Sequence, residues 1–177
     1  MAPTGYLNRL RVHHFGPESH SGVLTAGGVT LPCALGRNGI RATKREGDGV
    51  TPKGEFALRK LYFRPDRVPV PRCGLDIETI TPDLGWCDDT RSAAYNTPVI
   101  LPFAAGHERM SRDDHLYDLV IVIGHNDAPP RKGAGSAIFL HLAREGFKPT
   151  EGCVALRQDD LIRLLPRIGP DTVISIG

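Results

Sequence analysis

A cysteine and a histidine near the end of the chain have the residue types of a nucleophile and its base. Cys153 follows Gly152 directly, and His141 ends an apolar run a short loop earlier. A thiol on a tight glycine turn lies close to backbone N–H groups, which stabilise a thiolate and an oxyanion. A histidine on a neighbouring strand can accept the thiol proton. The pattern predicts acyl transfer by Cys153; the alternative is a buried structural cysteine beside a hydrogen-bonded histidine.

The segment around this cysteine resembles the signature of the YkuD-type L,D-transpeptidases, in which a strand-end histidine and a loop precede Ser/Thr-His-Gly-Cys-Ile/Val-Arg. The matching residues are His141, Thr150, Gly152, Cys153 and Val154. A second segment, Thr-Pro-Lys-Gly-Glu-Phe at residues 51–56, resembles the family's Thr-Pro-x-Gly-x-Phe/Tyr motif. The preceding segments 36–39 and 44–47 fit versions seen in proteobacterial members. The resemblance therefore extends from about residue 36 to the end of the chain.

The resemblance implies a mechanism, a fold and a location. Cys153 would attack the diaminopimelate–D-Ala carbonyl of a peptidoglycan stem, with N–H groups around Gly152 stabilising the oxyanion and His141 protonating the leaving amine. A second stem would resolve the thioester and form a crosslink. The implied fold is a mainly β L,D-transpeptidase sandwich with one late α-helix and long loops. The implied location is the periplasm or cell envelope, without cofactor, and carbapenem-type β-lactams are the expected covalent inhibitors.

Two positions depart from the family signature. Glu151 occupies the place of the histidine before Gly-Cys, and Ala155 that of the arginine after it, with Arg157 two residues further on. These changes leave the nucleophile and base in place. They point to a branch specialised for another linkage, so the crosslink is either of the 3-3 type or of a 1-3 type that uses L-Ala as donor.

Several polar residues are predicted to line the substrate site. The candidates are His125, Asn126, Thr150, Glu151 and Arg157. His125 and Asn126 follow the most apolar run of the chain, where the alternative is a polar loop start. Arg157, like Arg144 and Lys148, is near the cysteine and suits a stem carboxylate, where the alternative is a solvated charge.

Neither a metal nor a cofactor is predicted. His107 and His115 lie near Asp113 and Asp114, but their spacing matches no common ligand pattern. Ser136 is a candidate for orienting His141, although a plain serine at the start of a strand is the stronger interpretation.

Composition and charge exclude several other classes of protein. The 177 residues carry a net charge of +2, too small a bias to indicate nucleic-acid binding. No apolar run is long enough for a membrane span, and the first residues lack the apolar core of a signal peptide, which conflicts with the implied periplasmic location. The four cysteines show no CxxC pair. Pairing of Cys73 with Cys87 and simple burial both remain open.

The hydrophobic pattern predicts one mainly β domain over residues 1–177. Strands are expected at residues 7–14, 29–35, 54–63, 118–124, 137–142 and 172–176, and a helix at 158–167. The proline-rich stretch 65–116 is interpreted as an insertion or lid over the sheet, packed by Trp86 and Tyr95.

Other functions compete with crosslinking. An L,D-carboxypeptidase would use the same acyl-enzyme with water as acceptor, and attachment of an envelope protein would use it with another amine. A non-catalytic peptidoglycan-binding module is a different class, disfavoured by the intact Cys153 and His141. A papain-like protease is disfavoured because its cysteine precedes its histidine in the chain.

Overall fold

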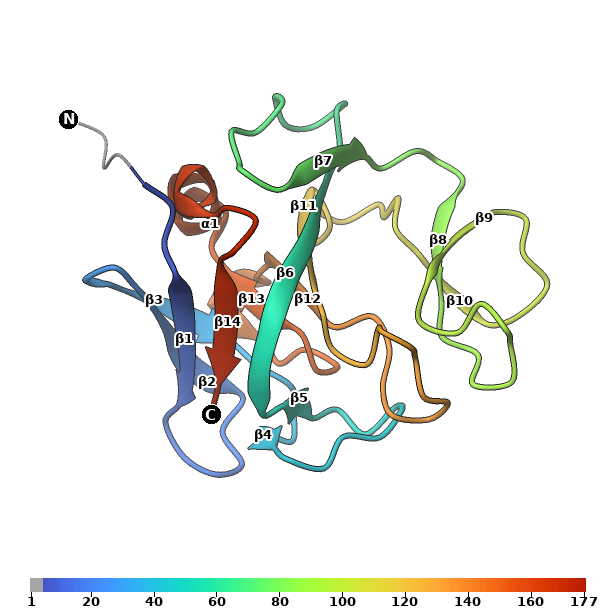
Figure 1. Cartoon of the computed structure of the whole chain (residues 1–177), viewed down its shortest axis with the longest axis horizontal. Coiled ribbons are helices and arrows are strands. Elements are labelled where there is room, and N and C mark those ends of the chain that lie inside the picture. The colour runs from blue at the N-terminus through green and yellow to red at the C-terminus, as the bar shows by residue number, and fades with distance from the viewer. Residues whose placement is uncertain (1–4) are drawn as a thin grey trace.

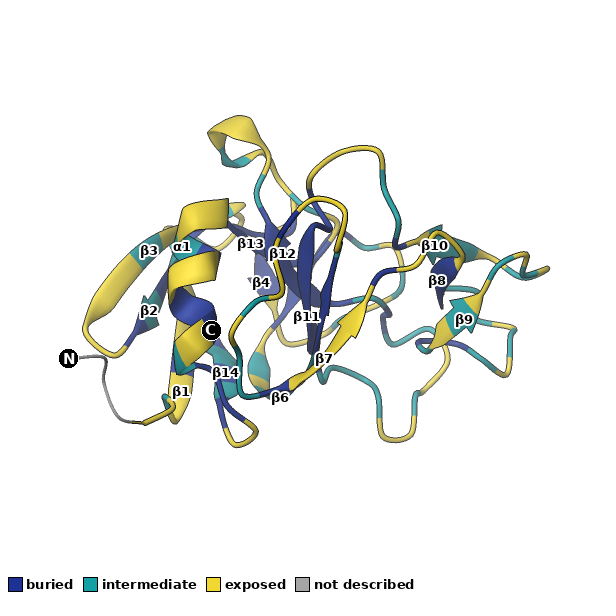
Figure 2. Cartoon of the chain, turned by 90° about the horizontal axis from the view of Figure 1, so that it is seen from above, coloured by how far each residue is buried: buried dark blue, intermediate teal, exposed yellow. Residues whose placement is uncertain are grey.

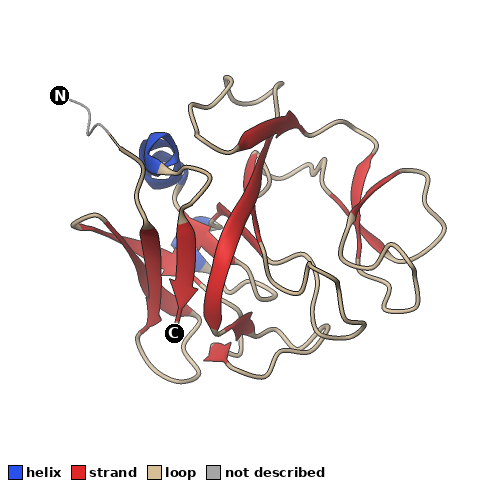
Figure 3. Cartoon of the chain, in the orientation of Figure 1, coloured by secondary structure: helices blue, strands red, loops and turns tan. Residues whose placement is uncertain are grey.

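The computed structural model describes residues 5–177, which are mainly β with a single short α-helix near the end (Figures 1 and 3). The strands are β1 (Arg9–His14), β2 (Ser21–Ala26), β3 (Val29–Ala34), β4 (Ile40–Arg41), β5 (Thr51–Pro52), β6 (Gly54–Phe63), β7 (Asp76–Thr79), β8 (Leu84–Cys87), β9 (Pro98–Ile100), β10 (His107–Arg109), β11 (Leu119–Ile123), β12 (Phe139–Leu142), β13 (Val154–Leu156) and β14 (Val173–Ile176). The helical segments are η1 (Glu145–Phe147), α1 (Gln158–Leu164) and η2 (Leu165–Arg167).

Most strands belong to one sheet that closes on itself. Its order is β11-β12-β13-β3-β2-β1-β14-β6-β7, and β11 also pairs with β6. The long strand β6 makes this closure, because residues 54–57 pair with β14 and residues 58–63 pair with β11. The larger apolar core lies inside this closed sheet. The expected mainly β class with one late helix is confirmed, and the sandwich takes the form of a closed sheet.

Strand β11 is apolar throughout because both of its faces are buried. Leu119, Ile121 and Ile123 point into the main core, whereas Val120 and Val122 belong to a second cluster on the outer face. A strand covered on both sides needs no polar residue at alternate positions. Figure 2 shows β11 and the neighbouring β12 as the most deeply buried part of the sheet. Side chains on these two strands therefore lie in the interior of the molecule.

Three strands of the main sheet were not expected from the sequence: β2, β13 and β7, which lies in the proline-rich stretch 65–116. In β2, the inward positions are Gly22, Leu24 and Ala26, and two small residues leave only a weak alternation of hydrophobicity. β13 is too short for a periodic signal. The strand expected at 137–142 begins two residues later, because Ala137 has a φ of 52° and leaves the extended conformation.

The single helix is shorter than expected. α1 ends at Leu164, and the 3-10 turn η2 follows in place of the last α-helical turn predicted for residues 158–167. Pro166 explains this end, because a proline inside an α-helix lacks the N–H for its hydrogen bond and clashes with the preceding turn. Leu161 and Leu164 are buried and pack the helix onto the core.

The proline-rich stretch 65–116 divides into two parts. Its first part contributes β7, which pairs with the end of β6 that β14 leaves uncovered. Strands β8, β9 and β10 then form a separate three-stranded sheet, here called the lid sheet, which lies away from β1 and β14 (Figure 1). That this stretch acts as a lid stays a prediction. Trp86 anchors the lid sheet, packing edge-on against Phe139 at 5.1 Å between ring centroids.

All four cysteines are free thiols, so the structure contains no Cys73–Cys87 disulfide. Cys33 and Cys87 are buried, as the burial interpretation predicts, and Cys73 is half-buried. Between residues 5 and 177, no helix is both long and apolar enough to cross a membrane.

The closed sheet predicts that shortening a buried side chain of β14 lowers the stability of the protein strongly. Ile174 is fully buried and is paired with Leu10 on one side and Phe56 on the other. Ile174→Ala should lower the free energy of unfolding by about 2–5 kcal/mol, because it removes buried methyl groups and leaves a cavity. Ile162→Ala on the exposed face of α1 is the control and should cost less than about 1 kcal/mol. Urea unfolding measures both; equal losses would contradict this account of the core.

Candidate active site

The turn before Cys153 depends on a glycine. Gly152 has a φ of 138°, which L side chains rarely adopt, and a Cβ at this position would lie 2.7 Å from the Val50 carbonyl oxygen. The backbone of the turn is therefore packed directly onto the backbone of the segment that leads into β5. No other residue type allows both the conformation and this close approach.

The hydroxyl of Thr150 closes the same turn. It accepts a hydrogen bond from the Gly152 N–H at 3.1 Å and donates one to the Cys153 carbonyl at 2.7 Å. The Thr150 backbone continues this connection, donating from its N–H to the Leu35 carbonyl at 2.9 Å and accepting from the Arg37 N–H at 3.0 Å. Thr150 thus holds the turn against the segment that follows β3.

The two sequence motifs meet at this place. Thr51, from the upstream motif, accepts a hydrogen bond from the Gly36 N–H at 2.8 Å, and Gly36 forms an isolated bridge with Thr150. Val50, which precedes Thr51, supplies the carbonyl against which Gly152 packs. The upstream motif therefore forms the support for the cysteine turn, although the two are far apart in the sequence.

The Cys153 thiol is buried between two backbone groups of the segment that enters β12. Its Sγ donates to the Ala137 carbonyl at 3.2 Å and accepts from the Phe139 N–H at 3.3 Å. Within the described part of the chain, the Cys153 N–H makes no hydrogen bond, so it is available to an oxyanion. Burial raises the pKa of the thiol to about 12, and the negative charge of Glu108 acts in the same direction. The Cys153 thiol is therefore neutral near pH 7.

His141 lies on the same face of the sheet as Cys153. β12 and β13 are parallel, with Leu140 opposite Val154 and His141 opposite Ala155. Because side chains alternate along a strand, Cys153, Phe139 and His141 share one face. The thiol and the imidazole are diagonal neighbours and are not hydrogen-bonded to each other in the structure described for residues 5–177.

The imidazole of His141 is oriented for proton transfer. Its Nδ1 is 2.9 Å from the Leu142 carbonyl oxygen, and a carbonyl can only accept, so Nδ1 carries the proton. In the neutral ring, Nε2 is then the free base. The ring of Tyr117 packs edge-on against the imidazole at 5.2 Å between centroids. Burial lowers the pKa of His141 to about 4, so the ring is neutral near pH 7 and can receive a proton.

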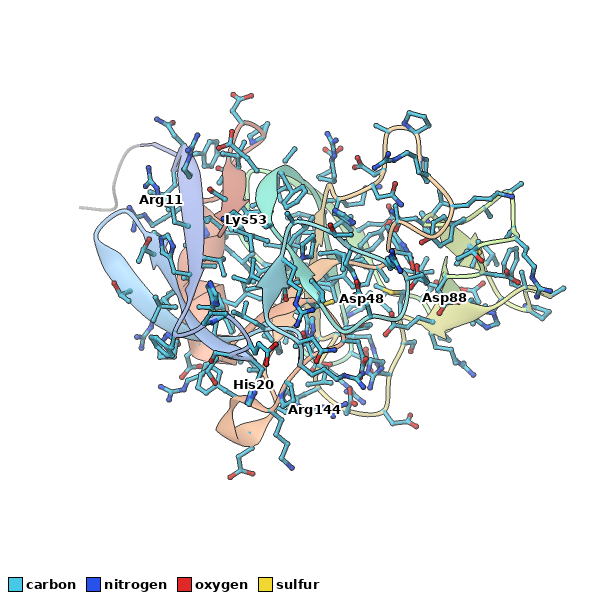
Figure 4. All side chains as sticks on the ribbon, turned by 90° about the horizontal axis from the view of Figure 1, so that it is seen from below. Arg11, His20, Asp48, Lys53, Asp88 and Arg144 are labelled. Carbon is cyan, nitrogen blue, oxygen red and sulfur yellow. The ribbon has the colours of Figure 1, made fainter. Side chains whose placement is uncertain are left out.

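A cleft of about 410 Å³ gives access to both groups, and charged side chains of both signs line it. Its basic residues include Arg112, Arg144 and Lys148, and Arg112 lies 3.7 Å from the acidic Glu108. Acidic Glu46 and Asp88 lie in the lining with Lys44. Figure 4 shows Asp88 beside the lid sheet and Arg144 on the turn that carries η1, so the cleft extends between these two segments.

The structure brings some of the predicted substrate-binding residues to the cleft. Thr150 and Glu151 line it, as do Arg144 and Lys148. The Thr150 hydroxyl is already used by the turn, and Glu151 is exposed and forms an ion pair with Arg37. Ser136 also lines the cleft, and no hydrogen bond to its buried hydroxyl is present among residues 5–177.

Three other predicted residues lie outside this cleft. His125 and Asn126 line a separate hollow of about 490 Å³. His125 Nε2 lies 2.9 Å from the Ala134 carbonyl, and the Asn126 amide donates to the carbonyls of Arg131 and Gly135, so both shape their own loop. Arg157 is exposed before α1, with its guanidinium over the Phe147 ring at 5.1 Å.

The sequence analysis did not identify three residues of the site, which come from the lid sheet and the loops beside it: Asn96, Glu108 and Tyr117. Asn96 is buried and accepts hydrogen bonds from Trp86 Nε1 and from the Ala137 N–H, both at 3.0 Å. Tyr117 packs on His141, and its hydroxyl donates to Glu108, which also lines the cleft. Single polar residues in an irregular segment show no periodicity, so the only signal was the proximity of Asn96 to Trp86 and Tyr95 in the sequence.

The comparisons with known proteins agree with this geometry. The model of the YkuD family, the L,D-transpeptidase catalytic domain, matches residues 20–176. The chain belongs to this family. That membership confirms the resemblance inferred from the two motifs, and it places Cys153 and His141 within a transpeptidase catalytic domain.

Similarity to individual relatives of this YkuD domain is low. The crystal structure of L,D-transpeptidase 1 from Mycobacterium tuberculosis has 13% sequence identity and a TM-score of 0.37, over 89% of this chain and 56% of that chain. The chain thus corresponds to little more than half the length of that protein. The search of curated proteins gave no match.

The packing of Gly152 predicts a stability loss on substitution. Gly152→Ala should lower the free energy of unfolding by about 2–4 kcal/mol, combining backbone strain with the contact against Val50. Gly133→Ala is a matched control, because Gly133 also has a positive φ of 79° but faces open space. It should cost only about 1 kcal/mol. Urea unfolding of both variants measures the difference, and equal losses would exclude the contact as the cause.

The buried thiol predicts an unusual pH profile. Since only the thiolate reacts and the pKa of Cys153 is raised to about 12, alkylation by iodoacetamide should rise about tenfold per pH unit from pH 7 to 10. Mass spectrometry of the Cys153 peptide measures the rate, with Cys153→Ala as the blank. A plateau near the ordinary thiol pKa of about 8.5 would show that the thiol is not held in its neutral form.

Proposed function

We propose that this protein is a peptidoglycan L,D-transpeptidase that forms a cysteine acyl-enzyme on a stem peptide. The observation that carries the proposal is the position of the Cys153 thiol, which is held between two backbone groups in a cleft that also contains His141. Membership of the YkuD catalytic-domain family supplies the reaction class. Cys153, His141 and Gly152 are the proposed catalytic residues.

The first half-reaction acylates the cysteine. The thiol leaves the Ala137 carbonyl, passes its proton to His141 Nε2, and attacks the donor carbonyl of the stem peptide. The oxyanion accepts from the free Cys153 N–H, an interaction typically worth about 3–4 kcal/mol per donor. The C–N bond then breaks, the imidazolium protonates the departing amine, and a thioester remains. A neutral thiol and a neutral imidazole are a suitable starting pair, because the proton moves between them only as the attack occurs.

The second half-reaction releases the thioester to an amine. A second stem peptide presents its amine to the carbonyl, His141 accepts the proton, and the thiolate leaves as the new amide forms. Water in place of the amine would give an L,D-carboxypeptidase, and no turnover would leave a binding module. We propose the transpeptidase because the chain belongs to the L,D-transpeptidase catalytic-domain family, and because charged side chains of both signs line the cleft, which suits peptides with carboxylate and ammonium groups.

The linkage and location are part of the proposal. Glu151 and Ala155 both line the cleft beside the nucleophile, at the positions where the sequence departs from the family signature. With Glu151 and Ala155 in the lining of the cleft, we propose a crosslink of the 3-3 type, or of the 1-3 type with L-Ala as donor. Peptidoglycan stems place the protein in the cell envelope, and carbapenem-type β-lactams are proposed as acylating inhibitors of the same cysteine.

Incubation of the protein with disaccharide-tetrapeptide tests this function. Mass spectrometry should detect a dimer, and its fragmentation identifies the linkage. Cys153→Ala should abolish the product, because it removes the nucleophile. His141→Ala should lower the acylation rate by about 100-fold or more near neutral pH, because it removes the base.

The matched controls are Cys73→Ala, which removes a half-buried thiol outside the cleft, and His20→Ala, which removes an exposed imidazole. Both should retain wild-type activity. A shortened monomer alone would indicate carboxypeptidase activity. Product formation by Cys153→Ala would refute the assignment of the nucleophile, and no product from any stem would favour the binding module.

A further inference from the structure

The lid sheet places a carboxylate in the catalytic cleft. Glu108 is the central residue of β10, opposite Trp86 of β8, and its side chain lines the cleft with Cys153 and His141. The Tyr117 hydroxyl donates to Glu108 Oε1 at 2.6 Å. Arg112 Nη1 is 3.7 Å from the same oxygen, which is beyond a hydrogen bond.

This carboxylate has too little positive charge around it. The guanidinium of Arg112 makes its short bonds to Asp114, at 2.8 and 2.7 Å. Two of the other charges that act on Glu108 are negative, those of Asp88 and Asp114. Burial raises the pKa of Glu108, against the lowering effects of Tyr117 and Arg112. Among residues 5–177, no protein group donates to Oε2, and this oxygen is not one of the enclosed unsatisfied atoms, so it is accessible from the cleft.

Glu108 lies close enough to Cys153 for its uncompensated negative charge to affect the thiol. After burial, its charge is the largest influence that raises the pKa of the Cys153 thiol. Tyr117 connects the two sites, because its hydroxyl binds Glu108 while its ring packs on both Phe139 and His141, at 5.8 and 5.2 Å between centroids. A cation bound at Glu108 would therefore be bound beside the reacting atoms.

We propose that Glu108 is a specificity-determining residue that binds, through Oε2, a primary ammonium group of the peptide that reacts with Cys153. The proposal rests on the proposed function for the identity of that peptide, a stem peptide containing a diamino acid. Arg144 and Lys148 also line the cleft, where they can bind a carboxylate of the same substrate. Substrates that lack the ammonium leave the charge of Glu108 uncompensated, and the enzyme discriminates against them.

Binding of the ammonium also assists the chemistry. The negative charge of Glu108 opposes formation of the thiolate, and a cation at Oε2 offsets that charge. The correct substrate thus makes the thiol easier to deprotonate when it arrives. This coupling links recognition to reactivity without a movement of the backbone.

A pair of thiol reagents of opposite charge tests the ammonium site without any stem peptide. Aminoethyl methanethiosulfonate carries an ammonium, and sulfonatoethyl methanethiosulfonate carries a sulfonate. In each case the Cys153 thiolate attacks the thiosulfonate sulfur, a disulfide forms, methanesulfinate leaves, and the thiol proton passes to the solvent. The ratio of the two rates reports how strongly the cleft prefers an ammonium, whatever the absolute reactivity of the thiol.

Glu108→Gln should reduce this ratio about three- to tenfold, because one full charge near the thiol is removed. Glutamine retains an oxygen that can accept from Tyr117, so the variant keeps the hydrogen bond and should unfold at the wild-type temperature. Glu108→Asp should keep most of the preference. The matched control is Glu145→Gln on the exposed turn η1, which removes the same charge outside the cleft and should leave the ratio unchanged. An unchanged ratio in Glu108→Gln would overturn the proposal.

A second measurement uses stem tetrapeptides with a free or an acetylated diamino-acid side chain. Wild-type kcat/KM should be at least about tenfold lower for the acetylated peptide, whereas Glu108→Gln should treat the two alike. Equal rates for both peptides in the wild type would also overturn the ammonium site. If no stem peptide reacts but the reagent ratio responds to Glu108 as expected, the transpeptidase function fails and the ammonium site is supported.

Discussion

The close packing of the Gly152 backbone onto the Val50 carbonyl is the contact on which the site depends. It fixes the turn that delivers Cys153 to the start of β13, and it requires that neither partner present a side chain at the point of contact. The Thr150 hydroxyl and the Thr51–Gly36 hydrogen bond then hold the two segments together from either side. Cys153, the proposed nucleophile, cannot shift without moving the segment that supports its turn. The proposed covalent mechanism benefits from such a fixed position, because small displacements of a nucleophile reduce rates strongly.

The lid sheet completes the site. Leu84 and Trp86 of this sheet belong to the second core cluster together with Phe139 and Cys153, so the lid sheet contributes to the apolar surroundings of the thiol. Asn96 links the lid to the Ala137 N–H, and the carbonyl of Ala137 holds the thiol. Glu108 reaches the cleft from the same lid sheet. The environment that keeps the nucleophile neutral is therefore built from a segment that has no regular hydrophobic pattern.

The parts of the structure that the sequence predicted are those where apolar residues repeat along a strand or where the informative residues are neighbours in the chain. β6 and β11 were identified within a residue of their ends. β11 is a run of buried apolar residues, and β6 is rich in Phe and Leu with Arg59 and Lys60 interleaved, and both patterns are typical of strands. The Gly152-Cys153 turn was identifiable because its conformation allows only glycine before the cysteine. β2 was missed because its inward residues are mostly small. Glu108 could not be identified from the sequence, because only the tertiary fold brings its hydrogen-bond partner Tyr117 close to it.

The electrostatics of the pair explain why substrate recognition and catalysis use the same cleft. Burial pushes the pKa of the thiol up and that of the imidazole down, so both groups are neutral across the physiological range. An ion pair between them would be costly in this environment, since neither charge is hydrated. In the proposed mechanism the proton therefore moves as the carbonyl is attacked, when the developing oxyanion meets the free N–H of Cys153. A neutral thiol reacts slowly with adventitious reagents, because the thiolate is the reactive form. The proposed role of Glu108 then makes the charges supplied by the substrate important for the start of the reaction.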